Sequence, residues 1–359
     1  MKTSLPIIIT AYLLLEVAFT AGAQTQGENY IYTYDVMEPV TNSSVLNNNT
    51  PDHVAIKTIQ YFDGLGRPSQ TVQKGFSFTN KDVIKPYEYN QFGVDTINYL
   101  PYVGEYSDGS FRPKVDADHA EFYSLRYDGD ANGYSPTLLE KSPLQRILKQ
   151  GAPGESWQIG HGGHPVSFQY LTNDNSSPLK VRNWTIVEEG KGKYTGYYPN
   201  GELYVIKTLD EDSLATYEFK DKQGRVVLKR SELSSASFAD TYYIYDDFGL
   251  LRYVLSPEGS DRISGDISMD DDPVKQFAYC YTYDSRKRLI EKRIPGKEPE
   301  YFIYNKADQV VLYQDGNMRK YFLGKPAFEW SFTKYDGLGR VLITGITYQY
   351  ATETRAAIQ

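Results

Sequence analysis

The chain has 359 residues, of which 40% are hydrophobic and 23% charged, a composition typical of globular rather than disordered proteins. The formal net charge is −8 and the sequence has no basic block, which argues against nucleic acid as a partner. The 33 Tyr residues, against 16 Phe and 3 Trp, favour half-exposed β-strands.

The first 23 residues have the pattern of an export signal. A basic start is followed by a mostly apolar stretch over residues 5–19, and residues 21–23 (Ala-Gly-Ala) are the small residues that signal peptidase recognises. The apolar stretch falls short of the roughly 20 residues needed to span a membrane. We therefore expect cleavage after Ala23, export to the periplasm, cell surface or medium, and no transmembrane helix in the mature chain.

A short pattern recurs along the chain: an aromatic residue, Asp or Asn, two variable residues, Gly, and then Arg or an apolar residue. It occurs at residues 62–67 and 335–340, with looser copies at 89–94, 221–225, 245–250, 283–288 and 304–309, and a shorter relative at 198–203. The Asp or Asn side chain can accept a hydrogen bond from the backbone two residues on, and Gly can adopt positive φ. The pattern therefore predicts β-hairpin turns.

Between residue 94 and about residue 195 the pattern is absent, and short helices are expected instead. Asp118 with Glu121 resembles a capping box. Ser142, followed by Pro143 and then Gln145, resembles the start of a second helix.

The strand pattern resumes in the second half of the chain. Tyr279, Tyr281 and Tyr283 alternate with smaller residues, which places their three rings on one face of a strand. Cys280 lies within this run and is the only cysteine, so it cannot form an internal disulfide. We predict that it is a small hydrophobic side chain in that strand.

The Gly- and His-rich residues 160–165 indicate a linker. We therefore predict a signal peptide at 1–23, an N-terminal domain of mixed β-structure with short helices at 24–165, and a β-hairpin repeat array at 166–359. The expected fold class is all-β, mainly antiparallel hairpin repeats, with one or two short helices in the N-terminal domain.

One segment has the spacing of a metal site. Asp128, Asp130 and Asn132 match the first half of a calcium loop, with oxygen ligands at alternate positions and a Gly at the sixth. The place of the bidentate Glu is taken by Leu139, with Glu140 one residue further on. Calcium binding and a plain polar turn both remain open, and the turn is the favoured interpretation.

Other candidate ligands have simpler interpretations. His161 and His164 are separated by two Gly residues, which favours a loop over a helical metal site, and residues 270–272 (Asp-Asp-Asp) are expected to form a solvated loop. The sequence contains no nucleophile–base motif and no phosphate-binding Gly loop. We therefore expect no catalytic residues, no cofactor, no metal and no enzymatic activity.

The repeated pattern, together with residues 60–68, 99–102 (Tyr-Leu-Pro-Tyr), 142–144 (Ser-Pro-Leu) and 151–154 (Gly-Ala-Pro-Gly), resembles the RHS or YD-repeat family of large secreted bacterial proteins. Residues 29–170 are similar to the uncharacterised domain that often precedes such repeats. The resemblance implies that this chain is the N-terminal part of such a protein. In that family the repeats form a spiralling β-sheet wall, often around a C-terminal toxin.

These observations predict an exported, non-enzymatic structural or interaction protein whose partner is another protein or a downstream YD-repeat polypeptide. Two alternatives remain: a carbohydrate-binding surface module, whose Tyr-lined strands stack on a glycan, and a glycoside-active enzyme. Residues 344–350 continue the strand pattern and contain no Pro or Lys to protect an edge. We therefore expect an exposed edge strand there and self-association through it.

Overall fold

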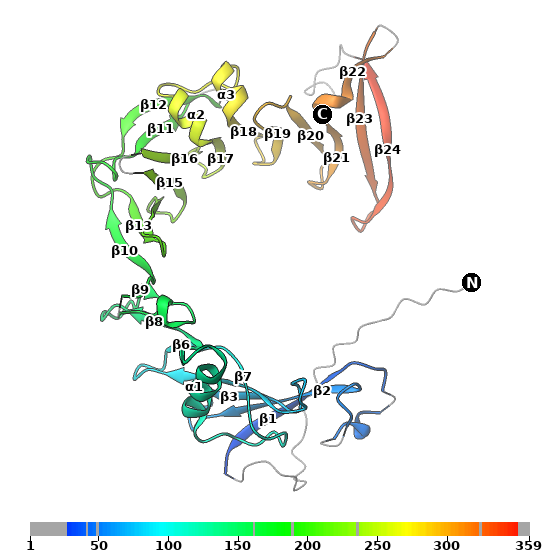
Figure 1. Cartoon of the computed structure of the whole chain (residues 1–359). Helices are drawn as coiled ribbons and strands as arrows, with labels where there is room; N and C mark the ends of the chain where they lie inside the picture. Colours follow the sequence, from blue (N-terminus) through cyan, green and yellow to red (C-terminus); the bar gives the residue numbers. More distant parts are fainter. Residues whose placement is uncertain are drawn as a thin grey trace. The chain divides into compact units, whose positions relative to one another are not determined.

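The computed structural model describes residues 27–40, 42–47, 50–160, 162–187, 190–234, 237–322 and 325–350. The expected signal peptide at 1–23 lies outside these residues. The chain divides into two compact units, the first comprising residues 1–146 and 150–165 and the second residues 147–149 and 166–359. Antiparallel strands dominate both units (Figure 1), so the predicted all-β fold class is confirmed.

The first unit is built on a five-stranded antiparallel sheet in the order β1-β2-β3-β4-β7. Its strands are β1 (Asn29–Val36), β2 (Ala55–Phe62), β3 (Pro68–Gln73), β4 (Val83–Pro86) and β7 (Tyr102–Val103), and a 3-10 turn, η1 (Ser43–Val45), precedes β2. Every second side chain of β2 is buried, as expected where one face of a sheet packs on a core. That core contains Ile59, Tyr61, Val72 and Tyr102, together with Tyr123 from helix α1 (Val115–Arg126).

A smaller set of strands completes the first unit. Strand β6 (Asp95–Tyr99) pairs with β5 (Glu88–Tyr89) on one side and β8 (Tyr134–Leu139) on the other. A second 3-10 turn, η2 (Glu155–Trp157), follows β9 (Ile147–Gln150).

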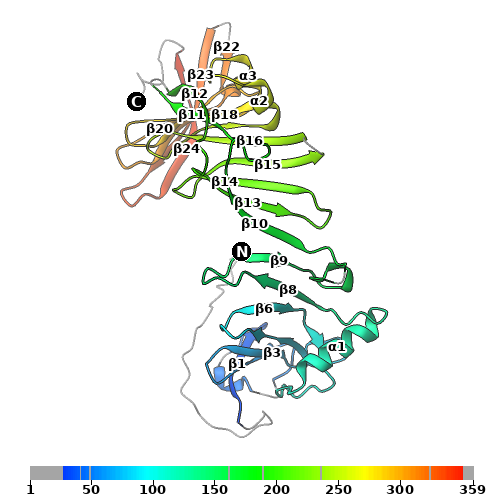
Figure 2. The same ribbon diagram turned by 90° about the vertical axis from the view of Figure 1, so that its left-hand side faces the viewer.

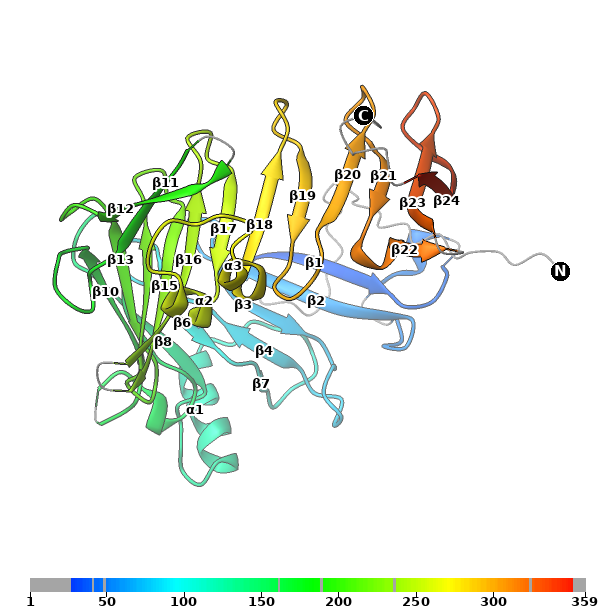
Figure 3. The same ribbon diagram turned by 90° about the horizontal axis from the view of Figure 1, so that it is seen from above.

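The second unit is one antiparallel sheet in which strands adjacent in the sequence are mostly adjacent in space (Figures 2 and 3). Its strands are β10 (Val166–Thr172), β13 (Tyr204–Leu209), β14 (Ala215–Lys220), β15 (Val226–Ser234), β16 (Ser237–Tyr245), β17 (Leu251–Leu255), β18 (Ala278–Tyr283), β19 (Leu289–Arg293), β20 (Glu300–Tyr304), β21 (Val310–Gln314), β22 (Arg319–Phe322), β23 (Lys325–Tyr335) and β24 (Val341–Tyr350). A short 3-10 turn, η4 (Gly316–Met318), precedes β22.

One face of this sheet is covered by an insertion and two short helices. The insertion is the hairpin of β11 (Arg182–Ile186) and β12 (Gly192–Tyr197), and the helices are α2 (Pro257–Arg262) and α3 (Asp272–Phe277). Trp184 of the hairpin packs against Tyr242 of β16 with ring centroids 5.1 Å apart. The main core of the second unit lies under this cover.

The helix predictions need three corrections. Helix α1 begins at Val115, so Asp118 lies inside its first turn and caps nothing. Residues 142–145 form a turn and not a helix, because the Ser142 hydroxyl donates to Glu140 and the Gln145 N–H bonds the Ser142 carbonyl. Helices also occur in the second unit, where none was predicted.

Two further predictions change in detail. Asp272 begins helix α3 and Asp271 is its N-cap, so residues 270–272 are not simply a loop. The shorter relative of the repeat pattern at 198–203 is not a hairpin turn, because β12 and β13 on either side of it pair with other strands. The side chain of buried Asn173 holds this segment instead, accepting from the Leu203 N–H and donating to the Pro199 carbonyl.

Candidate interaction surface

Eight turns among the described residues share one hydrogen-bonding pattern, which confirms that the repeated motif encodes hairpin turns. Numbering the Asp or Asn as position 1, its N–H donates to the carbonyl of position 5, and its side-chain Oδ1 accepts from the N–H groups of positions 3 and 5. The residue at position 4 has positive φ. The eight turns begin at Asp63, Asn90, Asp210, Asp221, Asp246, Asp284, Asn305 and Asp336.

Five of these turns lie along one end of the strands in the second unit. They join β14 to β15, β16 to β17, β18 to β19, β20 to β21 and β23 to β24. Because an antiparallel sheet reverses direction at every strand, alternate connections fall at the same end. The turns therefore form a row.

Within a turn, an Arg at position 5 closes the loop. The Arg67 Nε donates to Asp63 Oδ2 at 2.8 Å, and Arg225, Arg288 and Arg340 each make the same contact at 2.7 Å. The backbone N–H of Arg67 and then its guanidinium lower the pKa of Asp63, against the opposing effect of burial. The same two groups of Arg340 lower the pKa of Asp336. These carboxylates therefore hold the turns together.

Between turns, the same Arg contacts the aromatic residue that precedes the next turn. The guanidinium of Arg67 lies 4.4 Å from the ring centroid of Tyr89. Arg225 lies 5.0 Å from the ring of Tyr245, and Arg288 lies 4.8 Å from the ring of Tyr304. Such cation–π distances are favourable. Each of these three turns thereby contacts its successor.

The Tyr hydroxyls add a second link in the opposite direction. Tyr283, Tyr304 and Tyr335 donate to the carbonyls of Leu251, Leu289 and Val310 at 3.1, 2.8 and 3.0 Å. Each acceptor is position 6 of the preceding turn. Tyr304 thus contacts the preceding turn through both the face of its ring and its hydroxyl.

Close approach of neighbouring turns gives position 4 a second reason to be Gly. Gly249 has a φ of 77°, and a Cβ at this position would also lie 3.0 Å from Arg225 Nη1 of the previous turn. Where position 4 is Asp308, with a φ of 62°, its carboxylate accepts the neighbouring cations instead. Arg286 and Arg288 each form an ion pair with it at 2.9 Å. At Asp308 the previous turn therefore supplies the partners of the charged residue that stands in place of Gly.

The contact between turns predicts an energetic coupling. In a double-mutant cycle, Arg288→Gln and Tyr304→Leu should together destabilise the protein by about 0.5–1 kcal/mol less than the sum of the single changes. Tyr304→Phe is the matched control, because it keeps the ring and should keep the coupling. Urea unfolding of the four proteins measures this difference, and strictly additive losses would show that the stacked pair contributes no coupling.

The last described turn lacks a successor contact. Within the described part of the second unit, β24 pairs only with β23, and no ring lies over the Arg340 guanidinium. The Arg340 side chain is 74% exposed, whereas that of Arg288 is 14% exposed. The predicted edge strand is therefore present, while self-association through it stays a prediction.

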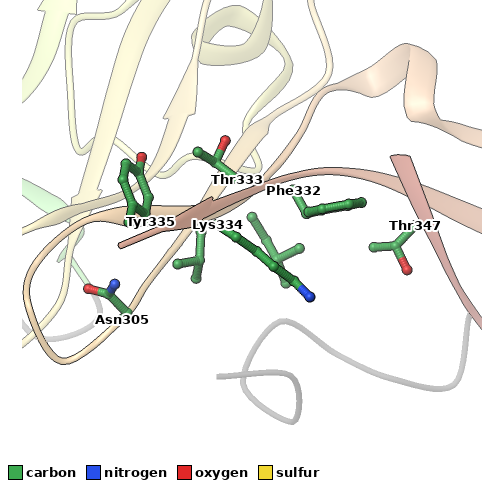
Figure 4. Close-up of a pocket in the computed structure, with 8 residues that line it drawn as sticks. Asn305, Phe332, Thr333, Lys334, Tyr335 and Thr347 are labelled. Carbon is green, nitrogen blue, oxygen red and sulfur yellow. The ribbon is translucent and has the colours of Figure 1, made fainter. Parts of the chain in front are cut away.

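Apolar side chains are exposed along this edge. Leu342, Ile343 and Ile346 of β24 are 64%, 57% and 57% exposed. Beside them is an open hollow of about 560 Å³ lined in part by Phe332 and Thr347 (Figure 4). The Phe332 ring lies over Gly345, where a Cβ would come within 2.8 Å of it. We call β24, Arg340 and this hollow the terminal edge.

The candidate calcium residues form a hydrogen-bonded turn. Asp130 Oδ1 accepts from the N–H and the side-chain amide of Asn132 at 2.8 and 2.9 Å, and Asp130 Oδ2 accepts from the Glu155 N–H at 2.7 Å. Asp128 is exposed at a φ of 50°. Hydrogen bonds from Arg146 and then Ser142 lower the pKa of Glu140 to about 2, so this carboxylate is engaged elsewhere.

The remaining candidates are also placed. His161 lies outside the described residues, and the ring of His164 lies 6.3 Å from that of Trp157. In the described parts of the chain, no group of three or more His, Cys, Asp or Glu side chains could hold a metal ion. Cys280 is 1% exposed in the core, and burial raises the pKa of its thiol to about 12, which confirms the prediction of a small buried side chain. No helix among the described residues is long and apolar enough to cross a membrane.

Comparisons with known proteins identify part of the chain. Residues 32–172 match a family model described as a domain of unknown function, DUF6443. No curated protein matches the sequence. The fold is similar to the crystal structure of TcdB2-TccC3-TEV, with a TM-score of 0.51, 12% identity and coverage of 90% of this chain and 14% of that one.

A second similar structure is that of TcdB2-TccC3 without its hypervariable C-terminal region, with a TM-score of 0.50, 12% identity and coverage of 84% of this chain and 13% of that one. This chain therefore spans a small part of the chains whose fold it shares. The comparisons therefore show a match to that domain over residues 32–172 and a fold shared with part of the TcdB2-TccC3 chains.

Proposed function

We propose that this chain is an exported, non-enzymatic structural component of an RHS-type assembly and that it binds another protein through the terminal edge. The observation that carries the proposal is the repeated link between consecutive turns, made by Arg and Tyr side chains and left open at Arg340. A chain whose repeated contacts join hairpin to hairpin is organised to extend a sheet.

The environment of the ionisable groups supports a structural role. Asp63 and Asp336 hold their turns through backbone N–H groups and Arg side chains. Asp82 is fully buried and accepts hydrogen bonds from the Gly109 N–H and the Arg112 guanidinium, both at 2.8 Å. Each of these carboxylates is satisfied by the protein itself, as stabilising groups are.

The comparisons support a role in a protein assembly. The similar structures carry two named components, TcdB2 and TccC3, and this chain corresponds to about a seventh of the matching chain. A chain with this fold and this length would need further polypeptide to build an equivalent structure. The terminal edge is where we place the added polypeptide.

Site-specific photo-crosslinking in the producing cells tests the proposal. A photoreactive residue at Leu342 should give a discrete adduct with another protein in the exported fraction. The matched control is Leu65, which is 79% exposed at the tip of a turn in the first unit and should give none. Absence of an adduct at position 342, or equal adducts at both positions, would contradict the proposal. So would a hydrolytic activity that one carboxylate substitution abolishes.

A further inference from the structure

We infer that the terminal edge binds a β-hairpin of a second polypeptide in which a Tyr directly precedes an Asp or Asn turn. This inference rests on the proposed function and names the chemistry of the partner. The partner's Tyr ring would stack on the Arg340 guanidinium, and its hydroxyl would donate to the carbonyl of Val341.

The template for this contact lies within the chain itself. Where turn 284–288 meets its successor, the Tyr304 ring lies 4.8 Å from the Arg288 guanidinium, and the Tyr304 hydroxyl donates to the Leu289 carbonyl at 2.8 Å. Val341 occupies position 6 of the last turn, as Leu289 does in the earlier one. Arg340 and Val341 therefore present the same two groups that receive Tyr304.

Position 7 is more exposed in the last repeat than in two of the internal repeats. Val227 and Ile290 occupy this position in two internal repeats, where they are 4% and 6% exposed. Leu342 occupies it in the last repeat and is 64% exposed. At about 25 cal/mol per Å² of buried apolar surface, covering Leu342 and Ile346 favours association. An added hairpin that packs against these two side chains would reduce their exposure.

The chain's own Tyr residues are already engaged, which favours a different polypeptide over a second copy. Tyr89, Tyr245, Tyr283 and Tyr304 each lie over an Arg of the turn-bearing hairpin before them. Tyr335 donates its hydroxyl to Val310. A second copy would have to break one of these contacts to present a Tyr to Arg340.

A hairpin peptide tests the inference on the full chain. The probe is a synthetic peptide with the sequence of residues 301–314, closed by a disulfide between cysteines added at its two ends, because Tyr301 and Gln314 are cross-strand partners. A fluorescent label reports binding by anisotropy. We expect saturable binding that Arg340→Gln weakens about fivefold, in line with a cation–π contact. Replacing the peptide Tyr that corresponds to Tyr304 by Leu should weaken binding by a similar factor.

The pairing of the two groups gives the decisive comparison. Combining Arg340→Gln with the altered peptide should weaken binding no more than either change alone, because both changes remove the same contact. The double variant Leu342→Lys, Ile346→Lys should abolish binding. Arg262→Gln, an exposed Arg in α2 paired with Glu258, is the matched control and should bind normally. Because Arg340 is exposed and its turn also holds through backbone hydrogen bonds, the variant should fold.

Several results would overturn the inference. One is peptide binding whose affinity does not change on Arg340→Gln or on replacing the peptide Tyr. Another is a dimer of the free chain that forms through β24 and is not dissociated by the peptide. An adduct at Leu342 in cells without peptide binding would sink this inference and leave the proposed function standing. Peptide binding that follows the expected pattern without any cellular adduct would support the contact and contradict the proposed function.

Discussion

Replacing Arg112 by Ala should lower the free energy of unfolding of the first unit by about 3–5 kcal/mol. The Arg112 guanidinium lies 2.8 Å from Asp82, and the two side chains are 8% and 0% exposed. Arg112 also pairs with Asp108 at 3.2 Å. Removing the guanidinium leaves the Asp82 carboxylate buried without a cation, and that uncompensated charge is the source of the loss.

The loss of stability caused by Arg112→Ala should depend on pH. Burial already raises the pKa of Asp82, so the folded state favours its protonated form more than the unfolded state does. The stability contributed by a raised carboxyl pKa is present at low pH and is lost as pH rises through it. We therefore expect the cost of Arg112→Ala to be smaller in acid than at neutral pH.

Urea unfolding at neutral and acid pH measures both effects, with the transition of the first unit resolved separately if the two units unfold independently. Arg146→Ala is the matched control, because the Arg146 side chain is 44% exposed in its ion pair with Glu140. An exposed pair should contribute about 1 kcal/mol or less. Similar losses for the two variants would show that burial does not set the strength of the Arg112 pair.

Gly66→Val should cost about 2 kcal/mol, whereas Gly64→Val in the same turn should cost less than about 0.5 kcal/mol. Gly66 has a φ of 77°, while Gly64 lies outside the positive-φ region. At neither position would a Cβ meet a heavy atom within 4 Å. The difference between the variants therefore isolates the backbone conformation. Equal urea midpoints would refute the assignment of position 4, and Gly339→Val against Gly337→Val repeats the test in the last turn.

The hairpin turns could be predicted from the sequence because their chemistry is local. Asp or Asn at position 1 bonds the backbone within four residues, so the motif carries its own hydrogen-bond partners. The turn at Asp210 was missed because Leu209 precedes it and Ser213, with a φ of 65°, takes the place of Gly. An Asp five residues before the next strand was the remaining signal.

The helices show where local signals fail. Ser142-Pro143 and Ser256-Pro257 carry the same helix-start pattern, yet only the second begins a helix. The Ser256 hydroxyl accepts the Gly259 N–H and donates to the Phe277 carbonyl, a partner brought in by helix α3. The Ser142 hydroxyl bonds Glu140 instead, within the connection between β8 and β9. Tertiary partners decide between the two outcomes.

The contacts between turns could not be derived from the sequence. Arg225 and Tyr245 belong to neighbouring copies of the motif, but their contact depends on the register of β15 with β16. Likewise, Arg252 reaches Tyr283 at 5.8 Å across a connection that contains two helices. Strand register and the folding of that connection are set by the whole sheet. The difference in exposure between Arg340 and Arg288 also depends on the sheet, because it reflects which strands lie beside each turn.

The link between turns gives the array a polarity. In the contacts between an Arg at position 5 and the Tyr before the next turn, the cation belongs to the earlier hairpin and the stacked ring to the later one, as with Arg225 and Tyr245 and with Arg288 and Tyr304. Across such a contact the two hairpins differ chemically, because the later one supplies a ring and the earlier one a guanidinium. Because a polypeptide is synthesised from its N-terminus, the Tyr of each such pair is made after the Arg that it contacts. The array can therefore grow vectorially, in the order in which its hairpins emerge.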